Sequence, residues 1–292
     1  MSSLGRDPTV TASATPGTPR GRLIGSGVVL LSAVLTACSS PQPPSTETTP
    51  TTAAAVALDA PLTHLHGLHI AAAGRLLAGT HSGLFSIDLA TGLTARVGDS
   101  DDDFMGLAGV TGTDGLVSSG HPGPSSDAPN PLGLRASSDG GQTWTTRSRS
   151  GETDFHVLAT DGPTVIGSDG RGLQMSSDGG ATWTPGADVA VAALAITPAA
   201  VWAVTPDGVS RSTDGARSFT VMPTAPSLAL LSGGTGGLWG VDTAGYAWFS
   251  PDGATWDRDD YVGSVEALTL APDGTGYAAS SNAVYTLSNS DR

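Results

Sequence analysis

Residues 137–145 read SSDGGQTWT and residues 176–184 read SSDGGATWT, so one nine-residue stretch occurs twice with a single change. Two weaker copies follow, STDGARSFT at 212–220 and SPDGATWDR at 250–258. The aspartate of each copy can accept hydrogen bonds from backbone N–H groups across a tight turn, and the glycine after it suits a positive φ. We therefore expect each copy to form a turn whose aromatic residue packs into a sheet.

The repeated pattern, S-x-D-G-G-x-T-W, is an Asp-box, and its aspartates are expected to be structural. They are Asp139, Asp178, Asp214 and Asp252, spaced 39, 36 and 38 residues apart. A period near forty residues, with short strands between many turns, is typical of a β-propeller with four strands in each blade. The sequence therefore predicts an all-β fold: a propeller of about six four-stranded blades over residues 58–292.

Charge and composition narrow the range of partners. The chain has a formal net charge of −14, with 27 acidic and 13 basic residues. An acidic chain without a basic run gains no counterion-release energy from phosphates, so we expect no nucleic-acid partner. We expect the protein to be a monomer.

The N-terminal region resembles a bacterial lipoprotein signal. Arg20 and Arg22 precede the apolar run LIGSGVVLLSAVL, which is short for a membrane span and suits a signal peptide. The run ends in LTAC, which resembles a lipobox and implies cleavage before a lipidated Cys38. Residues 38–57 are rich in Ser, Thr and Pro and predict a tether. We therefore expect a signal peptide at 1–37 and a protein anchored by lipid to the cell membrane, on its extracytoplasmic face.

All six histidines lie at or before residue 156, and three of them fall within THLHGLHI at 63–70. The first strand of each predicted blade shares a short pattern ending in leucine: HLHGL, DFMGL, DFHVL, AVAAL, PSLAL and SVEAL. Since side chains alternate along a strand, the third residue of each pattern should face the central channel. This inner ring comprises His66, Met105, His156, Ala192, Leu228 and Glu266. The first residues of the patterns form the next ring, namely His64, Asp103, Asp154, Ala190, Pro226 and Ser264.

The second strands are predicted to end at the same mouth of the channel. LLAGTH ends at His81, LVSSGH ends at His121 and TVIGSD ends at Asp169. In an antiparallel hairpin the end of the second strand lies beside the start of the first. Five histidines should therefore converge, with the Asp-boxes on the opposite face. His69 breaks the alternation and is expected to be structural.

A mouth lined by imidazoles, carboxylates and one thioether suits a transition metal. The predicted ligands are His64, His66, His81, Met105, His121 and His156. The thioether favours copper as the first choice, with zinc second. The zincin motif HExxH is absent from the sequence.

The segments HLHGLHI, GTHSGLF, DFMG, SGHP, GLRASSDGGQTW and DFH together resemble a family of bacterial secreted or lipid-anchored Asp-box (BNR) repeat propellers. Members of that family are usually labelled glycosylhydrolase or sialidase-like. The resemblance covers most of residues 63–186 and implies that the six metal-ligand candidates lie in shared motifs. It supplies no catalytic assignment.

Two alternatives to metal binding follow. In a glycosylhydrolase acting on glycans, Asp103, Asp154 and Glu266 are the candidate acids or bases, because paired carboxylates can have separated pKa values. A sialidase activity is less well supported, because no R-I-P motif precedes the first Asp-box. A sialidase also needs a tyrosine nucleophile, and the tyrosines of this chain, at 246, 261, 277 and 285, all lie in the last two blades. In the other alternative the propeller is a non-catalytic module that holds another envelope protein.

Overall fold

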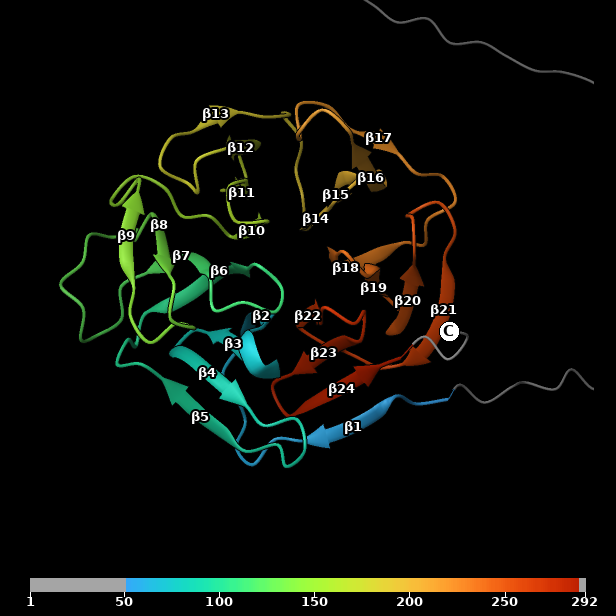
Figure 1. Ribbon diagram of the computed structural model, residues 1–292, viewed down its shortest axis with the longest axis horizontal. Coiled ribbons are helices and arrows are strands. Elements are labelled where there is room, and N and C mark those ends of the chain that lie inside the picture. Colours follow the sequence, from blue (N-terminus) through green and yellow to red (C-terminus); the bar gives the residue numbers. More distant parts are fainter. Residues whose placement is uncertain (1–50, 289–292) are drawn as a thin grey trace, which may run out of the picture. The chain divides into compact units, whose positions relative to one another are not determined.

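The computed structural model describes residues 51–288, which form six four-stranded antiparallel sheets arranged in a ring (Figure 1). The fold is therefore an all-β, six-bladed propeller, as predicted. The predictions for residues 1–37 and for Cys38 lie outside the described residues. Within residues 51–288, no helix has the length and apolar character needed to cross a membrane.

Blades 1 to 5 each contain four consecutive strands, the first on the channel and the fourth at the rim. Blade 1 contains β2 (Leu65–Ile70), β3 (Leu76–Thr80), β4 (Gly83–Ile87) and β5 (Thr94–Val97). Blade 2 contains β6 (Asp103–Gly109), β7 (Leu116–His121), β8 (Leu134–Ser137) and β9 (Thr145–Ser148). Blade 3 contains β10 (Val157–Thr160), β11 (Val165–Ser168), β12 (Leu173–Ser176) and β13 (Thr184–Pro185). Blade 4 contains β14 (Ala193–Thr197), β15 (Ala200–Thr205), β16 (Gly208–Ser212) and β17 (Thr220–Val221). Blade 5 contains β18 (Leu228–Gly234), β19 (Gly237–Asp242), β20 (Tyr246–Ser250) and β21 (Asp257–Tyr261).

Blade 6 joins the two ends of the described chain. Its first three strands are β22 (Ala267–Leu270), β23 (Gly276–Ser280) and β24 (Ala283–Leu287), and its outer strand is β1 (Ala54–Ala57). β1 pairs antiparallel with β24, with Val56 opposite Val284 (Figure 1). The sheet therefore begins before residue 58, the expected start of the propeller, because the free edge of β24 offers hydrogen-bond partners to the preceding segment.

The Asp-box turns connect the third and fourth strands of blades 2 to 5. In blade 3, Ser176 Oγ donates to Asp178 Oδ1 at 2.7 Å. Asp178 also accepts bonds from the Thr182 backbone N–H at 2.9 Å and from its hydroxyl at 2.6 Å. The Trp183 ring stacks on Phe155, with ring centroids 4.8 Å apart. Each box therefore closes its turn and packs an aromatic ring into the sheet.

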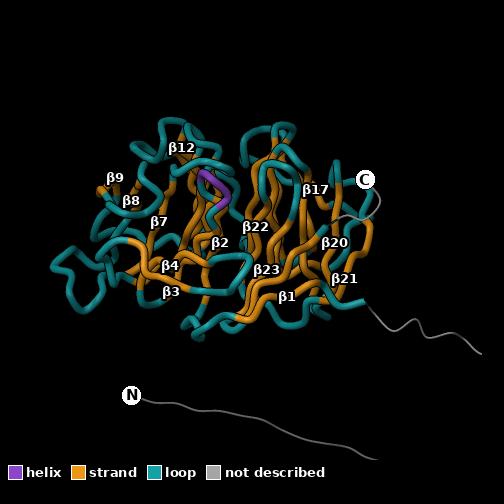
Figure 2. The backbone as a smooth tube through the Cα atoms, turned by 60° about the horizontal axis from the view of Figure 1, so that its bottom comes forward, coloured by secondary structure: helices purple, strands orange, loops and turns teal. Residues whose placement is uncertain are grey.

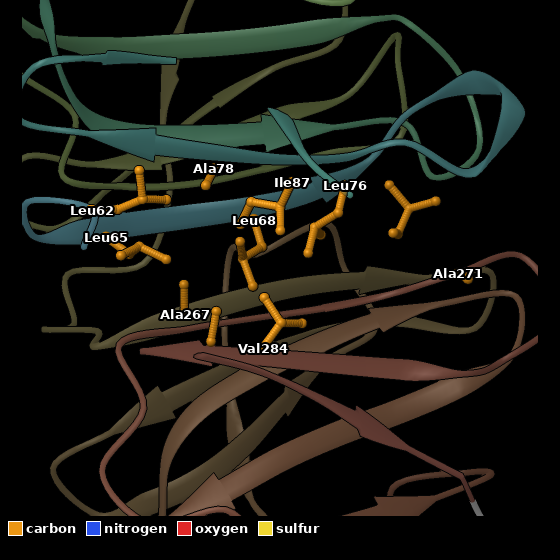
Figure 3. Packing of buried hydrophobic residues seen from close by; sticks show 11 residues of the cluster. Leu62, Leu65, Leu68, Leu76, Ala78, Ile87, Ala267, Ala271 and Val284 are labelled. Carbon is orange, nitrogen blue, oxygen red and sulfur yellow. The ribbon is translucent and has the colours of Figure 1, made fainter. Parts of the chain in front are cut away.

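The hydrophobic core lies between neighbouring blades. Figure 3 shows the cluster between blades 1 and 6, where Leu65 and Leu68 of β2 pack with Ala267 of β22 and Val284 of β24. The interface between blades 2 and 3 buries Phe155 and Leu134 completely. These interfaces hold the blades in fixed positions around the channel.

The two faces of the ring carry different turns. The Gly140 N–H of the blade 2 Asp-box donates to Asp114 O in the β6–β7 turn at 3.0 Å, so first hairpin turns and Asp-boxes share one face. The 3₁₀ turn η1 (Ala72–Gly74), between β2 and β3, lies on that face (Figure 2). The opposite face therefore carries the starts of the first strands and the ends of the second strands.

Candidate metal centre at the channel mouth

The HLH segment enters β2 through an irregular backbone. The pairing of β2 with β3 shifts register between Leu65 and Gly67, so His66 lies in a bulge. His64, just before the strand, has a φ of +47°, in the left-handed region that few non-glycine residues adopt. Leu65 is buried, whereas His66 is half-buried and lines the channel. The bulge and the left-handed residue together turn both imidazoles toward the mouth.

Three imidazoles form what we call the first group: His64, His66 and His81. One ring nitrogen of each lies within 4.8 Å of the others. His66 Nε2 is 3.3 Å from His81 Nδ1. Asp103, the first residue of β6 in the next blade, places Oδ2 2.8 Å from His81 Nδ1 and Oδ1 3.8 Å from His66 Nε2. The Asp103 Oδ1 atom is buried and has no hydrogen-bond partner among the described residues.

His66 has an altered acidity that suits a metal ligand. Burial lowers the pKa of His66 below its usual value, and the neighbouring His81 imidazole lowers this pKa further. The Asp103 carboxylate acts in the opposite direction without reversing the shift. His66 is therefore neutral at neutral pH, with a ring nitrogen lone pair available for a cation.

The remaining two predicted imidazoles form a second group around Asp154. Asp154 Oδ2 lies 2.6 Å from His156 Nε2 and 3.2 Å from His121 Nε2. His121 Nδ1 lies 2.7 Å from Asn130 Oδ1. The five histidines therefore reach the same face but divide into two groups, contrary to the single site expected, because each aspartate attracts the imidazoles nearest to it.

Glu266 lines the channel as predicted, but its carboxylate is occupied by local hydrogen bonds. Oε1 accepts the Ser281 N–H at 2.8 Å and the Ser281 hydroxyl at 2.6 Å, and Oε2 accepts the Leu65 N–H at 3.0 Å. Burial alone would raise the pKa of Glu266, but the bonds from Ser281 and Leu65 outweigh it and hold this pKa below the usual value. Glu266 is therefore ionised and ties blade 6 to the HLH segment.

The rest of the predicted rings are matched only in part. The channel cavity is lined by His66, His156, Ala192 and Glu266 of the predicted inner ring. A register shift after Leu228 buries this residue and brings Leu230 to the channel instead. Met105 is half-buried on β6, beside a similar shift between Asp103 and Gly106. Asp169 accepts a local bond from the Arg171 N–H.

Two polar residues outside the predicted ligand set, His69 and Asn130, have defined hydrogen-bond partners near the channel. His69 is buried and bonds to Thr113 O at 2.8 Å, as expected for a structural histidine. Asn130, which orients His121, was not predicted from the sequence. It lies in a loop between β7 and β8, where neither alternation nor a motif indicates which way a side chain points.

Neither protein-family models nor curated proteins match the chain in sequence. Its fold is similar to that of several solved structures. The Xanthomonas campestris protein XC5397, described as a gluconolactonase, has a TM-score of 0.61 and 13% identity, covering 83% of this chain and 96% of that one. A GH74 enzyme from Niastella koreensis has a TM-score of 0.53 and 15% identity, covering 80% of this chain and 53% of the enzyme, so this chain spans about half of it. The WD40 propeller domain of Doa1 has a TM-score of 0.52 and 9% identity, covering 84% of this chain and 98% of that one.

These likenesses place the chain in the class of β-propellers. At identities of 9% to 15% they establish the fold alone. Function therefore has to be argued from the groups at the channel mouth.

Proposed function

We propose that this protein is a lipid-anchored, extracytoplasmic β-propeller that binds a transition metal through the first group. The observation that supports the proposal is the convergence of His64, His66 and His81 within 4.8 Å, beside the unpartnered Oδ1 of Asp103. Three imidazoles with an adjacent carboxylate form a donor set typical of zinc and copper sites.

The distances in the first group suit a metal. Two nitrogens bound to zinc at about 2.05 Å in a tetrahedron lie about 3.3 Å apart, and His66 Nε2 and His81 Nδ1 are 3.3 Å apart. His64 and His81 are exposed, so their side chains can rotate to complete the site at little cost in packing. Asp103 lies beside both of these nitrogens and can serve as a further ligand.

We propose copper as the preferred metal and zinc as the second. Met105 is not among the side chains of the first group, which consists of three imidazoles beside the Asp103 carboxylate. An imidazole and carboxylate set without sulfur favours Cu(II) rather than Cu(I). At a site of this kind the Irving–Williams order places Cu(II) above Zn(II) in affinity.

The test is titration of the metal-free protein with Cu(II) and Zn(II) at pH 7.5. His66→Ala should weaken binding at least tenfold, because it removes the ligand closest to both His81 and Asp103. Ser176→Ala, in an Asp-box on the opposite face, is the matched control and should bind as the wild type does. Equal affinity of His66→Ala and wild type would contradict the proposal.

The lipid anchor is a separate part of the proposal. It is supported by the run LIGSGVVLLSAVL and the LTAC sequence at residues 35–38. Cys38→Ser should leave an uncleaved precursor that takes up no labelled fatty acid, whereas Ser39→Ala should be processed normally. Normal cleavage and labelling of Cys38→Ser would contradict the anchor.

The glycosylhydrolase alternative is supported by the fold of the GH74 enzyme and by the carboxylates at the mouth. Glu266 does not suit an acid role, since its low pKa keeps it ionised. Glycan and sialoside hydrolysis should be assayed beside the titrations. Glycan hydrolysis that Asp103→Asn or Asp154→Asn abolishes would support an enzymatic function. A protein that neither binds metal nor hydrolyses glycans would instead fit the non-catalytic interaction module.

A further inference from the structure

In the second group, both ring nitrogens of His121 lie beside oxygen atoms. The amide oxygen Oδ1 of Asn130 can only accept, so His121 Nδ1, 2.7 Å away, carries a proton. The other nitrogen, Nε2, faces the carboxylate oxygen Asp154 Oδ2 at 3.2 Å. A cation stabilises this approach, either as a proton on Nε2 or as a metal ion beside both atoms.

The Asp154 carboxylate is also incompletely partnered. Its Oδ2 atom faces both His121 and His156, whereas Oδ1 is buried and has no hydrogen-bond partner among residues 51–288. Leaving a buried carboxylate oxygen without a partner is unfavourable. A proton on His121 Nε2 would leave Oδ1 unpartnered, whereas a metal ion could bind both this oxygen and the His121 nitrogen.

We propose that His121, Asp154 and His156 form a second metal site, distinct from the first group. The donors are two imidazole nitrogens and one carboxylate, a set typical of divalent transition metals with further positions open to water. The Asn130 amide orients His121, as outer-shell acceptors commonly orient metal-binding histidines. His156 is more than half exposed, so it can move toward a metal held between His121 and Asp154.

The second group lies close to the first, so the channel mouth would hold two metal ions. His66 of the first group and His156 of the second line the same channel. Asp103 and His121 are directly opposite each other in the pairing of β6 with β7, so the two groups meet across one blade. The ligand class is a divalent cation of the zinc or copper type, with open positions facing solvent.

The test counts bound metal in the full-length protein after equilibration with Zn(II) or Cu(II) and dialysis. We expect two equivalents in the wild type, one in His66→Ala, one in Asp154→Asn, and none in the double variant. Asp154→Asn preserves the shape and removes the charge that the site needs. Asp161→Asn, in the β10–β11 turn on the opposite face, is the matched control and should retain two.

The outcomes separate this inference from the proposed function. One equivalent that His66→Ala removes and Asp154→Asn retains would overturn the second site and leave the proposed function standing. One equivalent with the reverse pattern would support the second site and contradict the first. One equivalent lost in both variants would mean a single site across both groups and would overturn this inference. No bound metal in the wild type would contradict both.

Discussion

Asp103 and Asp154 occupy equivalent positions in neighbouring blades, and each carboxylate contacts histidine side chains. Each precedes a buried phenylalanine, Phe104 or Phe155, that anchors the chain between blades. Because the anchored ring faces the blade interface, the preceding carboxylate faces the mouth, where it meets imidazoles. Each aspartate also has one buried oxygen without a hydrogen-bond partner among residues 51–288, and we propose that both bind a cation there.

Glu266 is predicted to hold the HLH segment in its metal-binding conformation. In Glu266→Gln, an amide placed with its oxygen toward Ser281 would turn its NH₂ group toward the Leu65 N–H, so the bond to Leu65 would be lost. We expect metal affinity to fall about tenfold, within the range for residues that support ligands from outside the ligand set. Isothermal titration measures the change. Glu152→Gln, at an exposed site, is the control, and equal affinity of both variants would contradict the role of Glu266.

The low pKa of His66 predicts how metal-free stability depends on pH. The folded state holds this imidazole neutral, whereas in the unfolded chain the imidazole takes up a proton at about pH 6.5. Since the folded pKa is lower, the contribution of His66 is fully present above pH 6.5 and is lost as pH falls below it. Denaturant midpoints from pH 7.5 to 5 should therefore fall more steeply in the wild type than in His66→Gln. Parallel curves for the two proteins would contradict this prediction.

At the scale of elements, register shifts explain why the site was only partly predictable. Alternation along the first strands correctly predicted that His66, His156 and Glu266 line the channel. It was wrong for Leu228, because an extra residue in β18 shifts the pairing beside it and buries this side chain. The grouping of imidazoles around separate aspartates depends on side-chain rotation, which the strand pattern does not encode.

The Asp-box turns are predicted to stabilise the fold without affecting the site. Ser176 is buried, donates to Asp178, and accepts the Gly180 N–H at 2.8 Å. Ser176→Ala leaves that N–H without its acceptor, and we expect a loss of about 1–2 kcal/mol in the free energy of unfolding. Urea denaturation measures it. Ser177→Ala, at the exposed neighbouring position, should be neutral, and unchanged stability of Ser176→Ala would contradict the scaffold role.

For the whole molecule, the spacing of the Asp-boxes correctly predicted a propeller of about six blades. The closing strand was not predicted, because Ala54–Ala57 lies in a segment whose Ser, Thr and Pro content indicates a tether. Its role depends on β24, more than two hundred residues away in sequence, which offers a free edge. Long-range pairing of this kind leaves no local signal.

Closure by β1 predicts that the N-terminal boundary of a stable propeller lies before residue 54. A chain beginning at residue 58 should have a lower melting temperature than one beginning at residue 51, because it lacks the pairing of β1 with β24. Its exposed β24 edge should also promote association. Thermal melting and size-exclusion chromatography test both effects. Equal melting temperatures would show that β1 does not stabilise the ring.

We expect a transition metal to bind the first group at the channel mouth. Anomalous X-ray diffraction at the zinc and copper absorption edges, from crystals of the protein equilibrated with each metal, tests this binding most directly. We expect an anomalous peak about 2.0–2.2 Å from a ring nitrogen of His66 and of His81, with His64 or Asp103 completing the ligands. Metal-equilibrated crystals with no anomalous peak among these residues would contradict it.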